Sequence, residues 1–215
     1  MAAVSETIVR EFFELSGFLV RQRRKYVAPS RREDEEIDFF VYNPQPATDT
    51  NPLPFVLELK DIPRVARAVV VVKGWHTGIF SPNLLTHTPE IFRFLEPGVF
   101  KQAARQFGGD GSISKILIVP ALPQNPTARE QSIALLRAKG IDAVMEFRTL
   151  LAGLITRIEV NRNYQKSDLL QIIRLLKNYD FIKDPQLELF RPAAKKRRRK
   201  AKAEASAPAT DQTAE

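Results

Sequence analysis

The stretch Val69-Val70-Val71-Val72-Lys73-Gly74-Trp75 is the most strongly β-forming segment of the chain, and the other elements are placed relative to it. A second apolar run that ends in lysine, Phe55-Val56-Leu57-Glu58-Leu59-Lys60, precedes it and predicts a short strand. Upstream of both, Glu36-Ile37-Asp38 lies at the start of a strand predicted over residues 35–42. Acids on neighbouring strands can hold a hard divalent cation through oxygen, and a lysine beside them can stabilise the charge that develops when a phosphodiester is cleaved.

The composition excludes several classes of site. The chain has 215 residues, enough for one ordinary domain and a tail. It has no cysteine, which excludes disulfides, thiolate catalysis and cysteine-based zinc sites, and only His76 and His87 can supply an imidazole. No apolar run approaches the roughly 20 residues that span a bilayer, and residues 1–5 lack the apolar core of a signal peptide. We therefore expect a cytoplasmic protein without a membrane partner.

The net charge of +8 is concentrated at the C-terminal end. From Arg191 onward eight basic residues stand against three acidic ones, so this end carries about +5 and the rest of the chain about +3. Its alanine, proline, serine and threonine content predicts a disordered basic tail over residues 186–215. Such a tail either binds nucleic acid through nonspecific, salt-sensitive contacts or serves as a solubilising or targeting segment. Its candidate nucleic-acid-binding residues are Lys195, Lys196, Arg197, Arg198, Arg199 and Lys200.

The remaining pattern predicts alternating helices and strands. Ser5 is a candidate N-cap of a helix that ends at Gly17, and a strand over residues 18–27 follows. The later segments are a short helix or turn over 61–68, a long helix over 89–107 broken at Pro97-Gly98, strands over 115–122 and 141–147, and helices over 127–139, 148–160 and 167–179. Helix, antiparallel strands and then strand–helix–strand predict an α/β/α sandwich with a central mixed sheet, formed by residues 1–185.

This order of elements resembles the PD-(D/E)XK nuclease superfamily, which has the restriction-endonuclease-like fold. In that family a glutamate on the first helix precedes a glycine-aromatic step into the first strand, and Glu6 here stands eleven residues before Gly17-Phe18. The second strand of the family begins with an acid-hydrophobe-aspartate triplet, which Glu36-Ile37-Asp38 matches. The likeness is greatest to methylated-DNA restriction endonucleases and archaeal Holliday-junction resolvases. It covers about residues 5–151, and the helices over 148–179 are an extra C-terminal part.

The acid-and-lysine strand of that family has two candidate positions here. If Glu58-Leu59-Lys60 is the motif, Glu58 and Lys60 share one face of a strand that faces Asp38, but the following strand over residues 69–75 is left without a place. If residues 69–73 form the strand, the order of everything downstream agrees, but Val71 stands where the acid should be. A valine cannot bind Mg²⁺, so Glu58 would have to supply the acid from the preceding segment, or the site would be inactive. The order of elements favours the second position.

Each candidate also has a purely structural interpretation. Glu58 and Lys60 can form an ordinary solvent-exposed strand face, and Asp38 can belong to an exposed acidic stripe. Three alternating basic residues either follow a phosphate backbone or pair with that stripe, and we expect pairing. They are Arg21, Arg23 and Lys25.

Two functions follow from the resemblance. The first is a metal-dependent nuclease acting on DNA, structure-directed or nonspecific, in which Asp38 and Glu58 bind Mg²⁺ or Mn²⁺, Glu6 holds or orients a water, and Lys60 or Lys73 activates it. The second is a catalytically inactive nuclease-fold protein that binds either nucleic acid or a protein partner. DNA is the expected nucleic acid. Related nucleases often form dimers to cut both strands, so the resemblance leaves a homodimer open.

Overall fold

The computed structural model describes residues 2–22, 37–48, 51–108 and 111–182. Contacts within the chain divide it into one compact unit, Met1–Pro185, and a second unit, Gln186–Glu215, which lies outside the described residues. The candidate residues Lys195, Lys196, Arg197, Arg198, Arg199 and Lys200 therefore lie outside the description, as do Glu36, Arg23 and Lys25. The sheet and the helices belong to the first unit.

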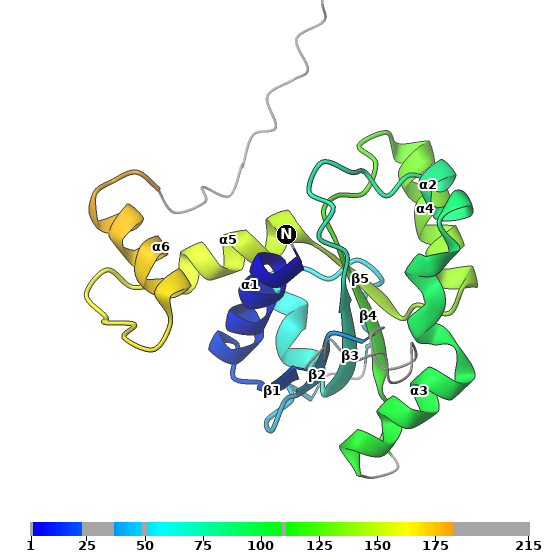
Figure 1. Ribbon diagram of the computed structural model, residues 1–215, viewed down its shortest axis with the longest axis horizontal. Coiled ribbons are helices and arrows are strands. Elements are labelled where there is room, and N and C mark those ends of the chain that lie inside the picture. Colours follow the sequence, from blue (N-terminus) through cyan, green and yellow to red (C-terminus); the bar gives the residue numbers. More distant parts are fainter. Residues whose placement is uncertain (1, 23–36, 49–50, 109–110, 183–215) are drawn as a thin grey trace, which may run out of the picture. The chain divides into compact units, whose positions relative to one another are not determined.

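Five strands form one mixed sheet in the order β1-β2-β3-β4-β5 (Figure 1). The antiparallel neighbours are β1 (Leu19–Gln22), β2 (Phe39–Tyr42) and β3 (Arg67–Val72). β4 (Ser114–Val119) and β5 (Ala143–Glu146) continue the sheet parallel to β3. The carboxyl ends of β3, β4 and β5 therefore share one edge. Because Gln22 pairs with Phe39, and Phe39 with Val70, the end of β1 and the start of β2 lie at that same edge.

β3 is buried on both faces, as its unbroken apolar sequence predicts. Ala68 and Val70 belong to the core cluster on one face of the sheet, and Val69 and Val71 belong to the cluster on the other face. The prediction that residues 69–73 contribute the core strand is confirmed, with the strand ending at Val72.

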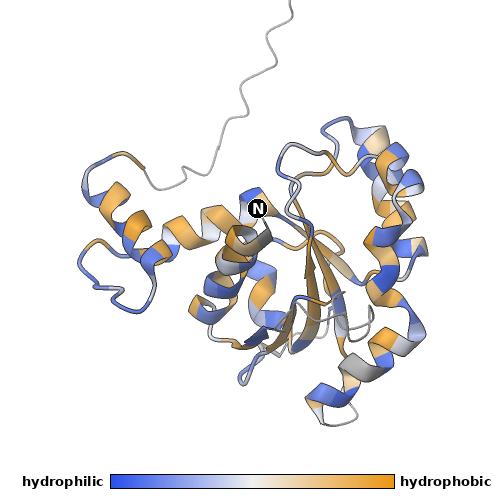
Figure 2. Ribbon diagram, viewed as in Figure 1, coloured by the Kyte–Doolittle hydropathy of each residue, from blue (hydrophilic) through white to orange (hydrophobic). Residues whose placement is uncertain are grey.

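Helices cover both faces of the sheet and give three layers (Figure 1). α1 (Ala2–Leu15), α5 (Phe147–Arg157) and α6 (Asp168–Asn178) bury apolar residues in one cluster. α2 (Pro82–His87), η3 (Pro89–Leu95), α3 (Pro97–Ala104) and α4 (Pro126–Ala138) bury theirs in the other, and η4 (Arg105–Phe107) follows α3. The central strands are mostly hydrophobic, the edge strand β1 ends in polar residues, and the helices are hydrophobic on one side (Figure 2). The predicted α/β class with a mixed sheet between helices is thus confirmed.

Two predicted elements differ from the structure. The helix predicted over residues 89–107 is three pieces, because Pro89 and Pro97 each begin a new helix and only the α3 piece is α-helical. The strand predicted over residues 55–60 is wrong: Val56 alone forms a β-bridge, to Val144 of β5, and the chain then enters the 3₁₀ helix η2 (Leu59–Arg64). The apolar residues of this run pack into the core at the free edge of β5. They do not form a strand in the middle of the sheet.

Candidate functional site at the carboxyl edge of the sheet

Asp38 lies directly before β2, and its side chain is bonded to the neighbouring strand. The Asp38 Oδ2 atom accepts a hydrogen bond from the Val72 N–H at 2.7 Å, and the Asp38 N–H donates to the Val70 carbonyl at 3.2 Å. Only 6 % of the residue is exposed. Because a buried carboxylate is costly unless it accepts hydrogen bonds, this contact holds Asp38 at the end of β3.

Of the two apolar runs that end in lysine, the run over residues 69–73 lies beside Asp38. Lys73 follows Val72 directly, is half-buried, and donates its backbone N–H to the Ile118 carbonyl at 2.9 Å. Val71 is 1 % exposed and packs in the cluster beneath the helices α2, η3, α3 and α4. Position 71, where the family resemblance expects an acid, is therefore apolar. A carboxylate at this position would lie in the hydrophobic core.

Glu6 lies at this same edge. Its Oε2 atom accepts a hydrogen bond from Gln22 Nε2 at 2.9 Å, which joins α1 to the end of β1. Gln22 pairs with Phe39, the residue after Asp38. Glu6, Asp38 and Lys73 thus occupy one end of three adjacent strands, where open α/β sheets place their ligands.

The loop after β3 is fastened to the first turns of α1. Ser5, which is buried, shares a hydrogen bond of 2.8 Å between its Oγ atom and His76 Nε2. Gly74 makes this approach close: a Cβ atom at position 74 would lie 2.6 Å from Ser5 Oγ. The His76 ring also meets Phe147 edge to face, with 4.6 Å between ring centroids. Residues from α1, the β3 loop and the start of α5 therefore converge beside the strand ends.

A shallow pocket of about 400 Å³ opens at this convergence. Its polar lining comes from His76 and Arg148, and the rest is apolar. The apolar lining residues are Pro120, Phe147, Leu151, Ala152 and Ile155. The size lies at the lower end of the range for small-molecule sites, and a few polar groups on apolar walls are typical of such sites.

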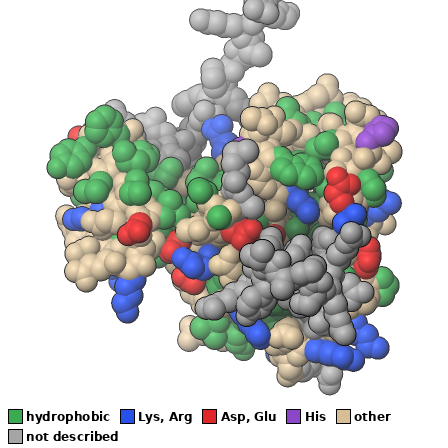
Figure 3. Space-filling model, in the orientation of Figure 1, with side chains coloured by type: hydrophobic (Ala, Val, Ile, Leu, Met, Phe, Trp, Pro, Cys, Tyr) green, Lys and Arg blue, Asp and Glu red, His purple; other side chains and the backbone are tan. Residues whose placement is uncertain are grey.

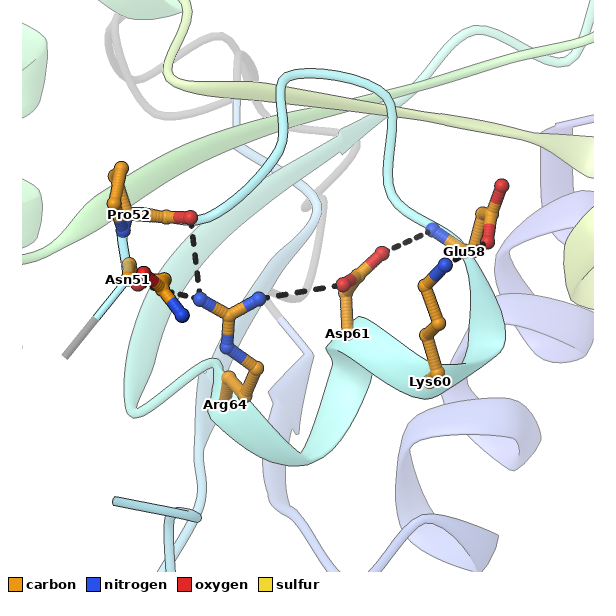
Figure 4. A network of polar contacts seen from close by, with 6 residues as sticks. All are labelled: Asn51, Pro52, Glu58, Lys60, Asp61 and Arg64. Atoms are coloured by element: carbon orange, nitrogen blue, oxygen red, sulfur yellow. Dashed lines mark hydrogen bonds and ion pairs between the residues drawn. The ribbon is translucent and has the colours of Figure 1, made fainter. Parts of the chain in front are cut away.

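Glu58 and Lys60 form a separate corner at the start of η2 (Figure 4). Their side chains pair with each other at 2.8 Å and are 65 % and 76 % exposed. The buried Asp61 carboxylate accepts the Glu58 N–H at 2.9 Å and the Arg64 guanidinium at 3.4 Å, and Arg64 also donates to backbone carbonyls of the preceding loop. These contacts begin the helix and fasten its loop, so the acid and lysine of this run form a structural corner.

The electrostatics of Lys60 agree with this interpretation. Its hydrogen bond to Glu58, followed by the charge of the same carboxylate, raises the pKa of Lys60 above its usual value. Lys60 therefore stays charged and paired with Glu58 at this corner.

The structure does not bring Asp38 and Glu58 together. The Phe55–Leu57 run lies beyond β5, since Leu57 N–H donates to the Val144 carbonyl at 2.8 Å, whereas Asp38 precedes β2. With β3, β4 and β5 between them, and about 4.8 Å for each strand spacing, the lateral separation of the 55–57 run from β2 is on the order of 19 Å. The two carboxylates therefore do not fit a shared Mg²⁺ or Mn²⁺ ion, and within the ranges that the structure describes no three acidic or histidine residues come together as metal ligands.

Sequence reasoning missed several residues of the carboxyl edge. Ser5 was considered only as a helix cap, whereas its hydroxyl contacts His76. No local signal in the sequence marks Gln22 and Arg148. The place of Gln22 at this edge depends on how β1 pairs with β2, and the place of Arg148 depends on where α5 begins. Arg21 was expected to pair with an acidic stripe, part of which, including Glu36, lies outside the described residues; Arg21 donates to Gln106 Oε1 at 2.6 Å.

Comparisons with models of known families, with curated proteins and with solved structures found no match. Among the described residues, no helix is long and apolar enough to cross a membrane.

Proposed function

We propose that this chain is a nuclease-fold protein that binds nucleic acid at the carboxyl edge of its sheet and does not cleave it. The observation that carries the proposal is the burial of Val71, the residue two positions before Lys73 on the core strand, in an apolar cluster. The acid and lysine of the other run, Glu58 and Lys60, pair with each other at the η2 corner. The order α1, β1, β2, β3, helices, β4, α4, β5 is the order that the family resemblance implies, and it supports the nuclease-like fold.

Nucleic acid is favoured as the partner by charge. The chain has 33 lysine and arginine residues against 25 acidic ones, and the basic run over residues 195–200 sits near its end. Such an excess gives affinity for a polyanion that falls as salt rises, because each phosphate contact releases counterions.

The direct test is binding of fluorescently labelled DNA and RNA, single-stranded and duplex, measured by anisotropy between about 50 and 200 mM salt. We expect binding without added metal and a steep salt dependence, with a smaller slope after deletion of residues 195–202. Absence of binding to every form at the lowest salt would overturn the proposal. An unchanged slope after the deletion would assign binding to the folded unit alone.

A metal-dependent nuclease is the second candidate, because Glu6, Asp38 and Lys73 do lie at one edge of the sheet. Its test is cleavage of the same substrates with Mg²⁺ or Mn²⁺ by the wild type, Asp38→Ala and Asp38→Asn. The Asp38→Asn variant keeps an oxygen for the Val72 N–H but loses the charge, so it separates chemistry from folding. If the wild type cleaves and both variants do not, the protein is a nuclease. If the wild type does not cleave, the nuclease is rejected and the binding protein remains.

A further inference from the structure

The pocket of about 400 Å³ lies where the chain changes from one face of the sheet to the other. The chain leaves β3 toward α2 and β4 toward α4, which bury apolar residues in one core cluster, but it leaves β5 toward α5, which belongs to the other cluster. The pocket lining follows these strand ends, with His76 after β3, Pro120 after β4, and Phe147 after β5. Open α/β sheets bind small ligands at such a switch point, outside the carboxyl ends of the strands, so the pocket has the position of a ligand site.

The apolar wall of the pocket is one side of α5. Leu151, Ala152 and Ile155 stand three, four and seven positions after Arg148, a spacing that places all four lining residues on one side of the helix. The side that carries Gly153 packs against α1, where an added Cβ atom would lie 2.8 Å from an aromatic carbon. The three apolar lining residues of α5 are only partly buried. They therefore offer an aliphatic surface that the apolar part of a ligand can cover.

Arg148 adds a positive charge to this apolar lining. It is exposed, and its guanidinium makes no hydrogen bond or ion pair with another described residue. The carboxylate of Glu146, two positions earlier, is engaged by the Leu122 N–H at 2.7 Å and by Arg129 at 3.1 Å. No acidic residue is among the described residues that line the pocket. The charge that complements the lining is therefore negative, and a guanidinium can hold a carboxylate through two parallel hydrogen bonds.

His76 supplies a second polar group, and its ring is held in place. The Ser5 Oγ atom lies 2.8 Å from His76 Nε2, and the ring of Phe147 meets the imidazole edge to face. The other ring nitrogen, Nδ1, has no hydrogen-bond partner among the described residues. When the Ser5 hydroxyl donates to Nε2, a neutral ring carries its proton on Nδ1 and can donate it to an anion. Because the ring is already held, little ordering is needed when a ligand binds.

We propose that this pocket binds a small organic carboxylate with an apolar body. The carboxylate pairs with Arg148 and accepts a hydrogen bond from His76, while the aliphatic or aromatic body covers Leu151 and Ile155. The two parts of the lining select this class together, because the apolar wall gives nothing to a small hydrophilic anion and the guanidinium repels an amine. The site is additional to the proposed nucleic-acid binding and does not depend on it.

Amide NMR of the full chain, titrated with octanoate, reports both the affinity and the location of binding. We expect the largest shift changes at His76 and over residues 147–155. Affinity should rise about fourfold for each methylene from butanoate to octanoate, because each one buries apolar surface against α5. Equal affinity along this series, or shift changes confined to the exposed apolar residues of α6, would overturn the inference.

Matched ligands separate the head group from the apolar body. Octanamide and octylamine keep the body of octanoate and replace the carboxylate by a neutral or a positive group, whereas inorganic phosphate has the negative charge and no body. All three should bind more weakly than octanoate. Equal binding of the amide or the amine would show that charge is not recognised, and equal binding of phosphate would show that the apolar wall is not used. Either result rejects the carboxylate site.

Matched variants assign the charge to Arg148. Arg148→Gln should weaken octanoate binding by about 10- to 150-fold, because a hydrogen bond to a charged group is lost, and Arg148→Lys, which keeps the charge without the paired hydrogen bonds, should lie between. Arg162→Gln, at an exposed arginine that does not line the pocket, should bind as the wild type does. Wild-type affinity in Arg148→Gln would overturn the inference. If that variant fails to fold, the ligand series on the wild-type protein still decides.

Discussion

Two corners of this molecule each follow an apolar run that ends in lysine, yet they differ in what surrounds the lysine. At the η2 corner Lys60 pairs with Glu58 in solvent, and the buried Asp61 holds the backbone in place. At the β3 end Lys73 stands between the buried Asp38 and a loop fastened to α1 by Ser5 and His76. The first corner is closed on itself, whereas the second gathers side chains from several elements. An acid and a lysine two residues apart in the chain therefore do not by themselves define a site, because the groups around them depend on the fold.

The surface over α6 differs from the surface over the sheet-bearing part. In the view of Figure 3, basic and acidic side chains are interspersed over the sheet-bearing part, and apolar side chains gather over α6. That apolar group corresponds to the exposed residues Ile172, Leu175, Tyr179 and Phe181. Lys177 of α6 donates to the Ile155 and Ile158 carbonyls at the end of α5, which fastens this helix to the unit.

The largest expected effect comes from Asp61→Ala, which removes the centre of the η2 corner. Asp61 is 3 % exposed and accepts hydrogen bonds from the Glu58 N–H and from Arg64, so its loss leaves two part-buried donors without this acceptor. We expect the free energy of unfolding in urea to fall by about 2–4 kcal/mol. Asp61→Asn, which keeps an acceptor, should cost less. Equal stability of Asp61→Ala and the wild type would show that the corner does not depend on this residue.

A smaller loss is expected from Gly74→Ala at the other corner. The added Cβ atom would lie 2.6 Å from Ser5 Oγ, so α1 or the loop must shift, at a cost of about 1–3 kcal/mol in urea unfolding. The cost should be partly relieved in the double variant with Ser5→Ala, which removes the clashing oxygen. Strict additivity of the two single variants would contradict the contact.

The smallest effects should come from Lys60→Met and Glu58→Gln. Their ion pair is exposed, and exposed pairs contribute little, so the unfolding midpoint and nucleic-acid affinity should both match the wild type. Any pH dependence of the free energy of unfolding that comes from this pair is set by Lys60, because Glu58 raises the pKa of Lys60. The contribution of the pair is fully present below the usual lysine pKa and disappears as pH rises through the raised value. Loss of nucleic-acid binding in either variant would show that the η2 corner is functional after all.

The sequence by itself determined the layers of the fold. The run over residues 69–72 could only be a buried strand, α1 stops just before Gly17 as expected, and the helix and strands after Lys115 follow their apolar periods. Asp38, interrupting an apolar strand, was also recognisable from the pattern, and its buried bond to Val72 explains the interruption.

Only the tertiary structure showed where the alternative run lies. The order of elements in the sequence already favoured the run over residues 69–73, although Glu58 is 20 positions from Asp38 and Lys73 is 35. Strand order agrees with that preference, because β3 pairs beside β2 while the run over residues 55–57 crosses to the free edge of β5. Lateral order in a sheet is set by pairing between distant segments and by which faces the helices cover, and spacing in the sequence does not encode it. For the same reason Ser5, Gln22 and Arg148 became neighbours of one edge only when the chain folded.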